Sequence, residues 1–365
     1  MYLSRLAIEN FRNFKTASLD FPSQGAVFFG PNGSGKTNLL ESIFFLCTAR
    51  SQRQASRDEM IAHASDLSFI DGVFSSLDGL TRKPVTIGFS RDKKVSMTAD
   101  GVPIASVSQW FGHGTVIPFG PEDINLVQGQ PRERRSFLDI VMCQIDREYL
   151  RELISYKRCL AERNALLSLH LDDMQLDTYE SLMVEHGASI FLKRRETIGF
   201  MRPLFADYYR EISGYGECAD MEYKPSVRCD SNTINDWKNV FYGCLKNAKK
   251  TDLQRGFSSI GPHRDDVLVT ISGREAKLFA SQGQCTTLTL SLRLCSIQYG
   301  EKNNKDTLIF LLDDALTFLD AARTLKVLPL LKGKGQIFFA TSSKPDRGLD
   351  GIPRFMVVDG RVQSE

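Results

Sequence analysis

The sequence predicts an α/β protein in which both ends of the chain build one domain and a helical segment is inserted between them. Short, continuously apolar stretches are typical of strands that a sheet buries on both faces. They occur towards both ends of the chain, at residues 26–29, 307–312 and 336–340. Residues 132–186 differ, because they contain no glycine or proline and are rich in Leu, Arg, Glu and Lys, which favours helices.

The N-terminal part predicts two strands joined by a turn, then a third strand and a helix. The apolar stretch Ala26–Phe29 stops at a glycine-rich turn, and apolar residues recur at helical spacing from Thr37 to Cys47. Residues 68–117 alternate short β-type stretches with turn residues such as Asp100-Gly101, which predicts an antiparallel meander.

After the helical segment, strands and helices alternate again. The expected elements are a strand at Val267–Ile271, a helix at Cys285–Ile297, a helix at Leu325–Leu331 between two apolar strands, and a hairpin at Phe355–Gln363. Residues 214–260 give no clear signal. We therefore expect an α/β domain formed by residues 1–120 and 255–365, and a helical domain formed by residues 121–254.

The composition excludes several classes of protein. The chain has 46 Lys and Arg against 44 Asp and Glu, so its net charge of +2 excludes a histone-like basic coat, and nucleic-acid binding must use a local patch. No pair among the 8 cysteines has the C-x-x-C spacing of zinc ribbons and redox motifs. No apolar stretch approaches the ~20 residues of a membrane span or forms a signal peptide. We expect a cytoplasmic protein with no membrane partner.

The most specific motif is a glycine-rich loop between the strand at 26–29 and the helix that follows. It matches G-x-x-x-x-G-K-[ST] in the context that this motif requires. Its glycines let backbone N–H groups point at phosphate oxygens, and the helix N-terminus adds a positive dipole. Lys36 would reach the β- and γ-phosphates of ATP, and Thr37 would bind Mg²⁺. The motif predicts a P-loop NTPase in which the nucleotide is bound by Gly30, Pro31, Asn32, Gly33, Ser34, Gly35, Lys36 and Thr37.

Two acids follow the apolar strand at 308–312. Carboxylates at the carboxyl edge of a parallel sheet lie beside a ligand that binds there. Asp313 would hold Mg²⁺, directly or through water, and Asp314 would be the general base that polarises the attacking water. The alternative is that these acids cap the next helix, with Asp314 at the N-cap.

A third segment, Ala280–Gln284, combines small residues with the start of a helix, which describes an anion site. One nucleotide does not need two such sites on one subunit. The second site makes sense if Ser281, Gly283 and Gln284 dock onto the γ-phosphate that another subunit holds. The alternative is a simple Ser-capped helix, which this segment alone favours.

Together these segments resemble the ATP-binding-cassette (ABC) superfamily. They occur in its order of phosphate loop, signature and strand with two acids, and Thr317–Asp320 stands in the D-loop position. The long stretch between Thr37 and Ser281 suits the branch of chromosome-maintenance and double-strand-break-repair ATPases. Within that branch nearly the whole chain is similar to the RecF family of bacterial recombination mediators, on the segments Ile8–Phe14, Pro121–Asp139 and Gly261–Asp266.

The resemblance implies an ABC ATPase head with an antiparallel β meander and an inserted helical lid, residues 121–254. It implies an ATP-dependent homodimer in which each Ser281 completes the other subunit's site. It also implies binding to duplex DNA and to single-strand/double-strand DNA junctions, and partnership with RecR, with RecO in the pathway, in loading recombinase. Arg12 should approach the bound phosphates, and Thr341 should make the γ-phosphate switch contact.

Departures from the family pattern predict slow ATP hydrolysis. Asp314 stands where faster cassette ATPases use Glu, and a shorter carboxylate places the water less well. Phe318 takes the place of an acid in the D-loop, and Thr341-Ser342-Ser343 replaces a run of threonines. Two rival functions remain open: another chromosome-maintenance-like or anti-phage ABC ATPase, and a transporter ATP-binding subunit.

Basic residues of the helical segment could line a groove for duplex phosphates. The alternative is a solvated surface on which interleaved acids pair with them. The sequence does not decide between the two for any one residue, and it assigns no role to His263. The basic residues are Arg132, Arg134, Arg135, Arg147, Arg151, Lys157, Arg158, Arg163, Lys193, Arg194, Arg195 and Arg202.

Overall fold

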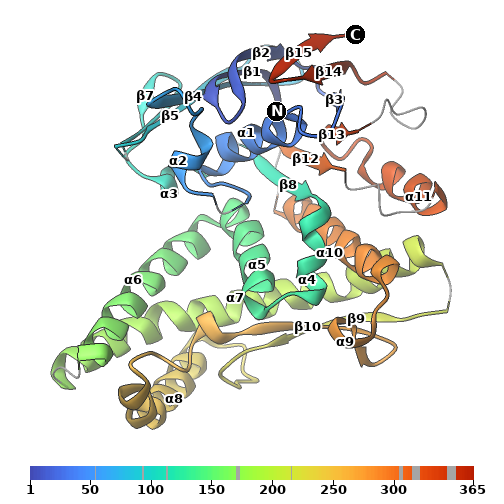
Figure 1. Ribbon diagram of the computed structural model, residues 1–365. Coiled ribbons are helices and arrows are strands. Elements are labelled where there is room, and N and C mark those ends of the chain that lie inside the picture. The colour runs from blue at the N-terminus through green and yellow to red at the C-terminus, as the bar shows by residue number, and fades with distance from the viewer. Residues whose placement is uncertain are drawn as a thin grey trace. The chain divides into compact units, whose positions relative to one another are not determined.

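The computed structural model describes the chain except residues 54, 93, 112–113, 170–172, 215, 304–306, 315–320 and 343–350 (Figure 1). It has a terminal unit, Met1–Asp123 with Ser296–Glu365, and an inserted unit, Ile124–Cys295. The second boundary of the inserted segment, expected at residue 255, therefore lies after Cys295. The reason is strand pairing, because β10 (Asp266–Ile271) pairs along its whole length with β9 (Ala219–Lys224).

A mainly parallel sheet forms the core of the terminal unit. Its strand order is β15-β14-β3-β13-β12-β8, and the β14–β15 hairpin is its antiparallel edge. The stretches predicted as buried strands are β3, β12 and β13, and almost all of their side chains are buried. The bounds are β3 Gly25–Phe29, β8 Thr115–Phe119, β12 Leu308–Asp313, β13 Gln336–Thr341, β14 Arg354–Val358 and β15 Arg361–Ser364.

The predicted meander forms the second sheet of the terminal unit, which is antiparallel and has the strand order β2-β1-β4-β5-β6-β7. The end of the stretch expected to form the meander behaves differently, because β8 joins the parallel sheet beside β12. The bounds are β1 Tyr2–Phe11, β2 Phe14–Asp20, β4 Leu67–Ser75, β5 Arg82–Ser90, β6 Val95–Ala99 and β7 Val102–Pro103.

Helix α1 (Lys36–Thr48) packs against strands of both sheets (Figure 1). Its residues from Leu39 to Thr48 are all buried, as expected of a helix that is enclosed on every side. Gln336 also ties the sheets together. Its buried side-chain amide accepts the Leu3 N–H and donates to the Leu3 carbonyl, each at 2.8 Å. The side chain thus pairs with β1 as the backbone of a neighbouring strand would.

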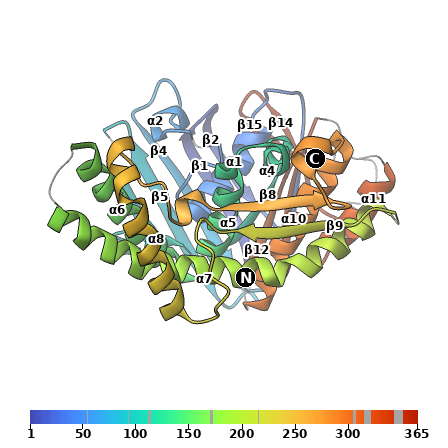
Figure 2. The same cartoon turned by 90° about the horizontal axis from the view of Figure 1, so that it is seen from below.

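Four helices of the inserted unit pack side by side, and a three-stranded sheet, β11-β10-β9, runs along α7 (Figure 2). Residues 214–260, which gave no clear signal, contain β9 and α8. The ends of α8 carry ordinary signals, since Thr233 accepts the Asp236 N–H and Gly256 closes the helix in the left-handed conformation. The bounds are α5 Pro131–Ile145, α6 Arg147–Leu169, α7 Asp173–Ser213, α8 Ile234–Arg255 and β11 Arg274–Glu275.

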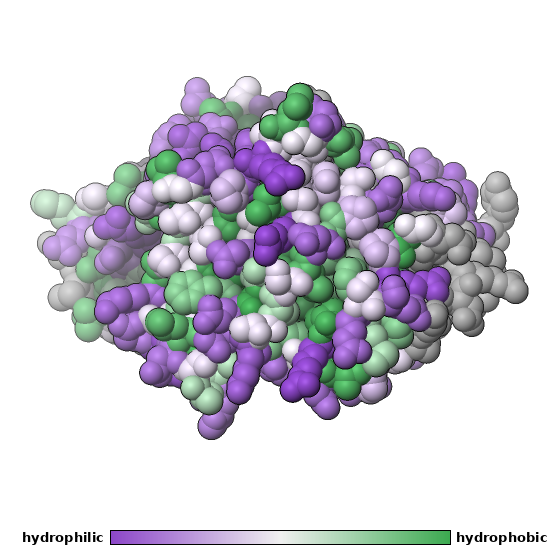
Figure 3. Space-filling view, turned by 90° about the horizontal axis from the view of Figure 1, so that it is seen from above, coloured by the Kyte–Doolittle hydropathy of each residue, from purple (hydrophilic) through white to green (hydrophobic). Residues whose placement is uncertain are grey.

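The other helices are α2 Arg57–Met60, α3 Val107–Trp110, α4 Asn125–Gln128, α9 Ala276–Phe279, α10 Gln282–Lys302 and α11 Ala321–Leu331, with 3-10 turns at Pro121–Ile124 and Pro262–Arg264. None of the described helices is long and apolar enough to cross a membrane. The face of the molecule in Figure 3 intersperses hydrophilic and hydrophobic residues.

Candidate nucleotide-binding site

The glycine-rich loop connects β3 to α1, as predicted. Gly30, Gly33 and Gly35 have φ values of 149°, 79° and 114°, which side chains rarely allow. Two of these glycines are also confined by space. A Cβ at Gly30 would lie 2.2 Å from the Val357 carbonyl oxygen, and one at Gly35 would lie 2.6 Å from the Asn13 amide. The loop therefore needs glycine at both places for its backbone to turn into α1.

Two turns brace this loop from outside. The Asn13 side-chain amide, in the β1–β2 turn, and the Gly360 N–H, in the β14–β15 turn, both donate to the Ser34 carbonyl at 3.0 Å. Asn38 of α1 donates in turn to Asn13 at 2.8 Å. These bonds hold the loop in shape before a ligand binds, and they come from residues that the motif itself does not include.

The predicted phosphate and metal residues lie together. The Lys36 ammonium donates to the Gly30 and Pro31 carbonyls at 2.8 and 2.9 Å, so it lies across the loop. The Thr37 hydroxyl donates to Asp313 Oδ1 at 2.9 Å. Burial raises the pKa of Asp313, and the charge of Asp314 acts in the same direction, whereas the bond from Thr37 opposes it. These hard oxygen donors suit Mg²⁺, whose charge would favour the ionised carboxylate.

Asp314 is strained and incompletely hydrogen bonded. Its φ is 45°, and its N–H donates to the Ala340 carbonyl at 3.0 Å. Its Oδ1 is buried without a hydrogen-bond partner in the described part of the chain. A buried acceptor left unpaired costs free energy, so this oxygen fits a group that receives a proton. The helix cap that was the alternative would engage residues that lie outside those described.

The ends of three neighbouring parallel strands bring the site together. Gly30 follows β3, Asp314 follows β12, and Thr341 ends β13, which lies between them in the sheet. In the ladder Asp313 pairs with Ala340, and Thr341 pairs with Phe29. The predicted switch residue therefore stands at the same edge as the phosphate loop. The predicted D-loop, Thr317–Asp320, and Ser343 lie outside the described residues.

Arg12, which was expected to approach the phosphates, forms a bidentate ion pair with Glu41. Its Nε and Nη2 donate to the two carboxylate oxygens at 3.0 and 3.1 Å, and Nη1 donates to the Glu59 carbonyl at 2.8 Å. Glu41 is buried on α1, one helical turn after Thr37, and also accepts the Ser51 hydroxyl at 2.7 Å. Sequence reasoning missed Glu41, although a charged residue inside an apolar helical stretch is a usable signal.

Ser281 and Gln284 form a capping box at the start of α10, in the inserted unit. The Gln284 N–H donates to Ser281 Oγ at 3.3 Å, and the Ser281 N–H donates to Gln284 Oε1 at 2.7 Å. The capped helix considered from the sequence is therefore present. Capping does not exclude anion binding, because a hydroxyl that accepts a hydrogen bond still has its own proton to donate. Gly283 lies in the first turn of α10.

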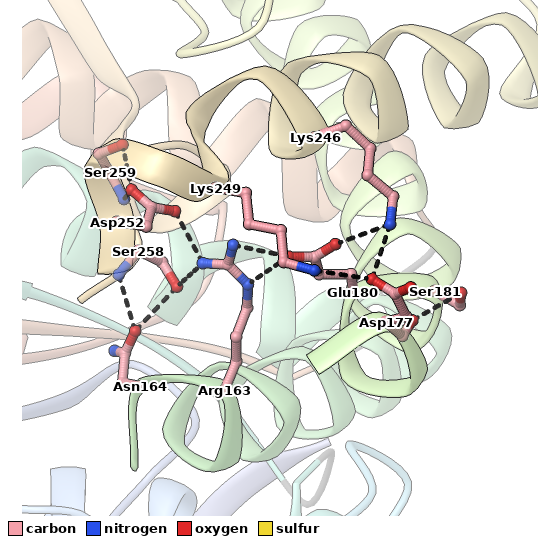
Figure 4. A network of polar contacts seen from close by, with 10 residues as sticks. All are labelled: Arg163, Asn164, Asp177, Glu180, Ser181, Lys246, Lys249, Asp252, Ser258 and Ser259. Carbon is pink, nitrogen blue, oxygen red and sulfur yellow. Dashed lines mark hydrogen bonds and ion pairs between the residues drawn. The ribbon is translucent and has the colours of Figure 1, made fainter. Parts of the chain in front are cut away.

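Most of the basic clusters are ion-paired, which supports the alternative interpretation for them. Arg163 is buried and donates to Glu180 of α7, Asp252 of α8 and Ser258 (Figure 4). Other pairs are Arg134–Asp266, Arg194–Asp139, Arg194–Asp265, Lys193–Asp146 and Arg202–Asp220. These cations hold the inserted unit together. The exposed cations on α6 are Arg147, Arg151, Lys157 and Arg158.

His263 belongs to the same internal framework. Its Nδ1 shares a hydrogen bond with the Tyr156 hydroxyl at 2.7 Å, and its Nε2 with the Ser258 carbonyl at 3.1 Å. Burial lowers its pKa to about 4. Gly261 packs closely here, because a Cβ at this residue would lie 2.1 Å from the Tyr156 hydroxyl. The segment Gly261–Asp266 is therefore a junction between α6 and β10.

Known proteins resemble the chain over almost its full length. A family model described as the RecF/RecN/SMC N terminal domain matches residues 2–346. DNA replication and repair protein RecF of Bacillus cytotoxicus is 35% identical over 356 residues, which are 96% of this chain and 93% of that protein. RecF of Bacillus cereus strain B4264 is 35% identical over 358 residues, again 96% and 93% of the two chains.

Solved structures agree. The recombination mediator protein RecF with ATP, described as part of the RecFOR pathway, superposes with a TM-score of 0.92 at 28% identity and covers 100% of this chain and 97% of that one. An Smc head bound to the C-terminal domain of ScpA shares the fold, with a TM-score of 0.57 at 15% identity, covering 100% and 96%. The fold and the phosphate-loop site define an ABC-type ATPase head of the RecF/RecN/SMC class.

Within that class, the chain belongs to the RecF family of DNA replication and repair proteins. The predicted resemblance, the ABC-head fold and the ATPase activity are confirmed, and so is the binding of ATP. The two rival functions, a transporter subunit and an ABC ATPase of another family, are set aside by this membership.

Proposed function

We propose that the chain acts in recombinational repair as an ATP-dependent homodimer that binds duplex DNA and single-strand/double-strand junctions. RecR would be its partner in loading recombinase, with RecO in the same pathway. The similarity to the ATP-bound RecF of the RecFOR pathway supports this assignment. ATP binding closes the dimer on DNA, and slow hydrolysis reopens it.

The observation that carries the proposal is the arrangement of the hydrolytic residues beneath the phosphate loop. Backbone N–H groups of the loop bind the phosphates, and the Lys36 ammonium exchanges its two carbonyl partners for β- and γ-phosphate oxygens. Thr37 and Asp313 hold Mg²⁺, which neutralises the charge that develops on the transferred phosphoryl group. Asp314 Oδ1 accepts a proton from the attacking water as ATP becomes ADP and phosphate.

Dimerisation explains why the chain has a second anion site. The capping box fixes Ser281 at the start of a helix of 21 residues and leaves its hydroxyl proton available to a phosphate oxygen. A second copy, with the γ-phosphate bound to its own loop, supplies the acceptor. Ser281 then donates in trans, and neither site is complete without the other chain.

Three exposed cations on one face of α6 suit the DNA contact. Arg147, Arg151 and Arg158 are spaced by four and seven residues, so a helix places them on the same side. Two such faces, one from each copy, would bind DNA more strongly than either alone. This reconciles DNA binding with a net charge of only +2.

DNA binding with and without ATP tests the proposal. We expect binding to gapped DNA that requires ATP, weakens steeply with salt and coincides with dimer formation in analytical ultracentrifugation. ADP in place of ATP serves as the matched control. Equal DNA affinity with ATP, with ADP and without nucleotide would contradict the ATP-driven dimer.

A further inference from the structure

The side chain of Gln284 is held at both ends, and one of its partners lies outside the signature. Its Oε1 accepts the Ser281 N–H at 2.7 Å, and its Nε2 donates to Glu217 Oε1 at 2.7 Å. The other oxygen of Glu217 accepts the Tyr209 hydroxyl at 2.6 Å. Glu217 is in the connection between α7 and β9, and all four residues belong to the inserted unit.

The charge of Glu217 determines which way the Gln284 amide faces. An ionised carboxylate only accepts hydrogen bonds, so it selects the NH₂ end of the amide. The carbonyl end then faces the Ser281 N–H. If the amide turned over, its carbonyl would face the carboxylate and its NH₂ would face the Ser281 N–H, and both contacts would be repulsive. One half of the capping box therefore depends on Glu217.

We propose that Glu217 is a positioning residue for the signature of the ATPase. Through Gln284 it keeps Ser281 in the capped geometry, in which the hydroxyl proton is free to donate to the γ-phosphate held by a second copy of the chain. The inference rests on the homodimer proposed above. It also connects the signature, through Tyr209, to the C-terminal end of α7.

The experiment compares three variants of the full chain. Glu217→Met has a similar length but accepts no hydrogen bond, whereas Glu217→Gln keeps a carbonyl that can face Gln284. Glu211→Met, at an exposed position of α7, makes the same chemical change away from the signature. Each is measured for ATP-dependent dimerisation by analytical ultracentrifugation, for ATP binding at low protein concentration and for thermal stability.

We expect Glu217→Met to weaken dimerisation about tenfold, a change of about 1.4 kcal/mol in association free energy. ATP affinity of the single chain should be unchanged, because the phosphate loop is in the other unit. Glu217→Gln and Glu211→Met should stay within about threefold of the original chain, since a typical neutral hydrogen bond contributes about 1 kcal/mol. Normal dimerisation of Glu217→Met would overturn the inference.

A second comparison remains valid if Glu217→Met folds poorly. Gln284→Met should weaken dimerisation by a similar factor, and Glu217→Met should have no further effect in that background. Additive effects of the two substitutions would overturn the positioning role. A failure of the original chain to dimerise with ATP is a different result, because it would overturn the proposed homodimer together with this inference.

Discussion

Asp314 carries two costs that folding alone does not explain. A residue other than glycine in the left-handed region costs on the order of 1 kcal/mol or more, and its buried oxygen, unpaired within the described part of the chain, adds a further cost. The position follows the strand that supplies Asp313, and Asp313 contacts the threonine of the phosphate loop. Strain of this kind collects at sites of chemistry, which agrees with a role for Asp314 in hydrolysis.

Replacing Asp314 with asparagine should separate binding from hydrolysis. Asparagine keeps the shape of the side chain but cannot accept a proton from water, so phosphate release should fall by about a hundredfold or more. ATP affinity should be unchanged, and the ATP-bound dimer should persist for longer in analytical ultracentrifugation. Asp100→Asn, in an exposed turn, is the control. A monomeric Asp314→Asn chain in ATP would contradict the assignment.

His263 should make stability depend on pH. Its pKa in the folded protein is about 4, against about 6.5 for an unperturbed histidine, so between these values the unfolded chain binds a proton that the folded chain does not. Its contribution is therefore complete above about pH 6.5 and is lost as the pH falls towards 4. Urea denaturation at about pH 5 and 7 should show a shallower dependence for His263→Gln. His63→Gln, at an exposed position, should keep the original dependence.

At the scale of elements, α6 shows what sequence patterning can and cannot predict. The pattern predicted the helix, but not which of its cations would be used inside the fold. Arg163 pairs with acids on α7 and α8 that are 17 and 89 residues away, and only the packing of three helices brings them together (Figure 4). Buried ion pairs of this kind depend on non-local contacts, which periodicity does not encode.

The exposed face of α6 gives a direct prediction for DNA binding. Replacing Arg147, Arg151 and Arg158 with alanine should weaken duplex affinity and reduce the slope of log affinity against log salt by about 2 to 3, at about 0.9 per lost phosphate contact. The control replaces Lys193, Arg202 and Lys238, each of which is ion-paired, and changes the net charge equally. Equal losses in the two variants would mean that α6 acts only through net charge.

At the scale of the whole molecule, the sequence predicted the order of elements more accurately than the division into units. The buried strands and the phosphate loop follow from short stretches of chain, so β3, β12 and β13 occur where expected. The second boundary of the inserted unit was placed too early, because β9 lay in a stretch without clear signals and its pairing with β10 could not be foreseen. The hydrolytic site was largely predictable, because parallel strands end at one edge, whereas Glu41 and Glu217 act through contacts distant in sequence.

Substituting Ser281 with arginine tests how two copies meet. The larger side chain removes the donor hydroxyl and fills the space at the start of α10, so ATP-dependent dimerisation should be lost. Because the phosphate loop is in the other unit, the single chain should still bind ATP, as measured by calorimetry. Ser18→Arg, at an exposed position of β2, should dimerise normally. Loss of ATP binding in Ser281→Arg would count against a contribution in trans.

The position of β3 in the parallel sheet has a consequence for synthesis of the chain. Its two neighbours, β13 and β14, come from the last part of the sequence, and Leu3 is bonded to Gln336. The inserted unit, in contrast, is one continuous segment. Since domains generally fold as units during translation, the helical unit can fold on the ribosome while the first strands are still waiting for their partners. The ATPase core is thus completed last, and chaperones would meet its unpaired N-terminal strands first.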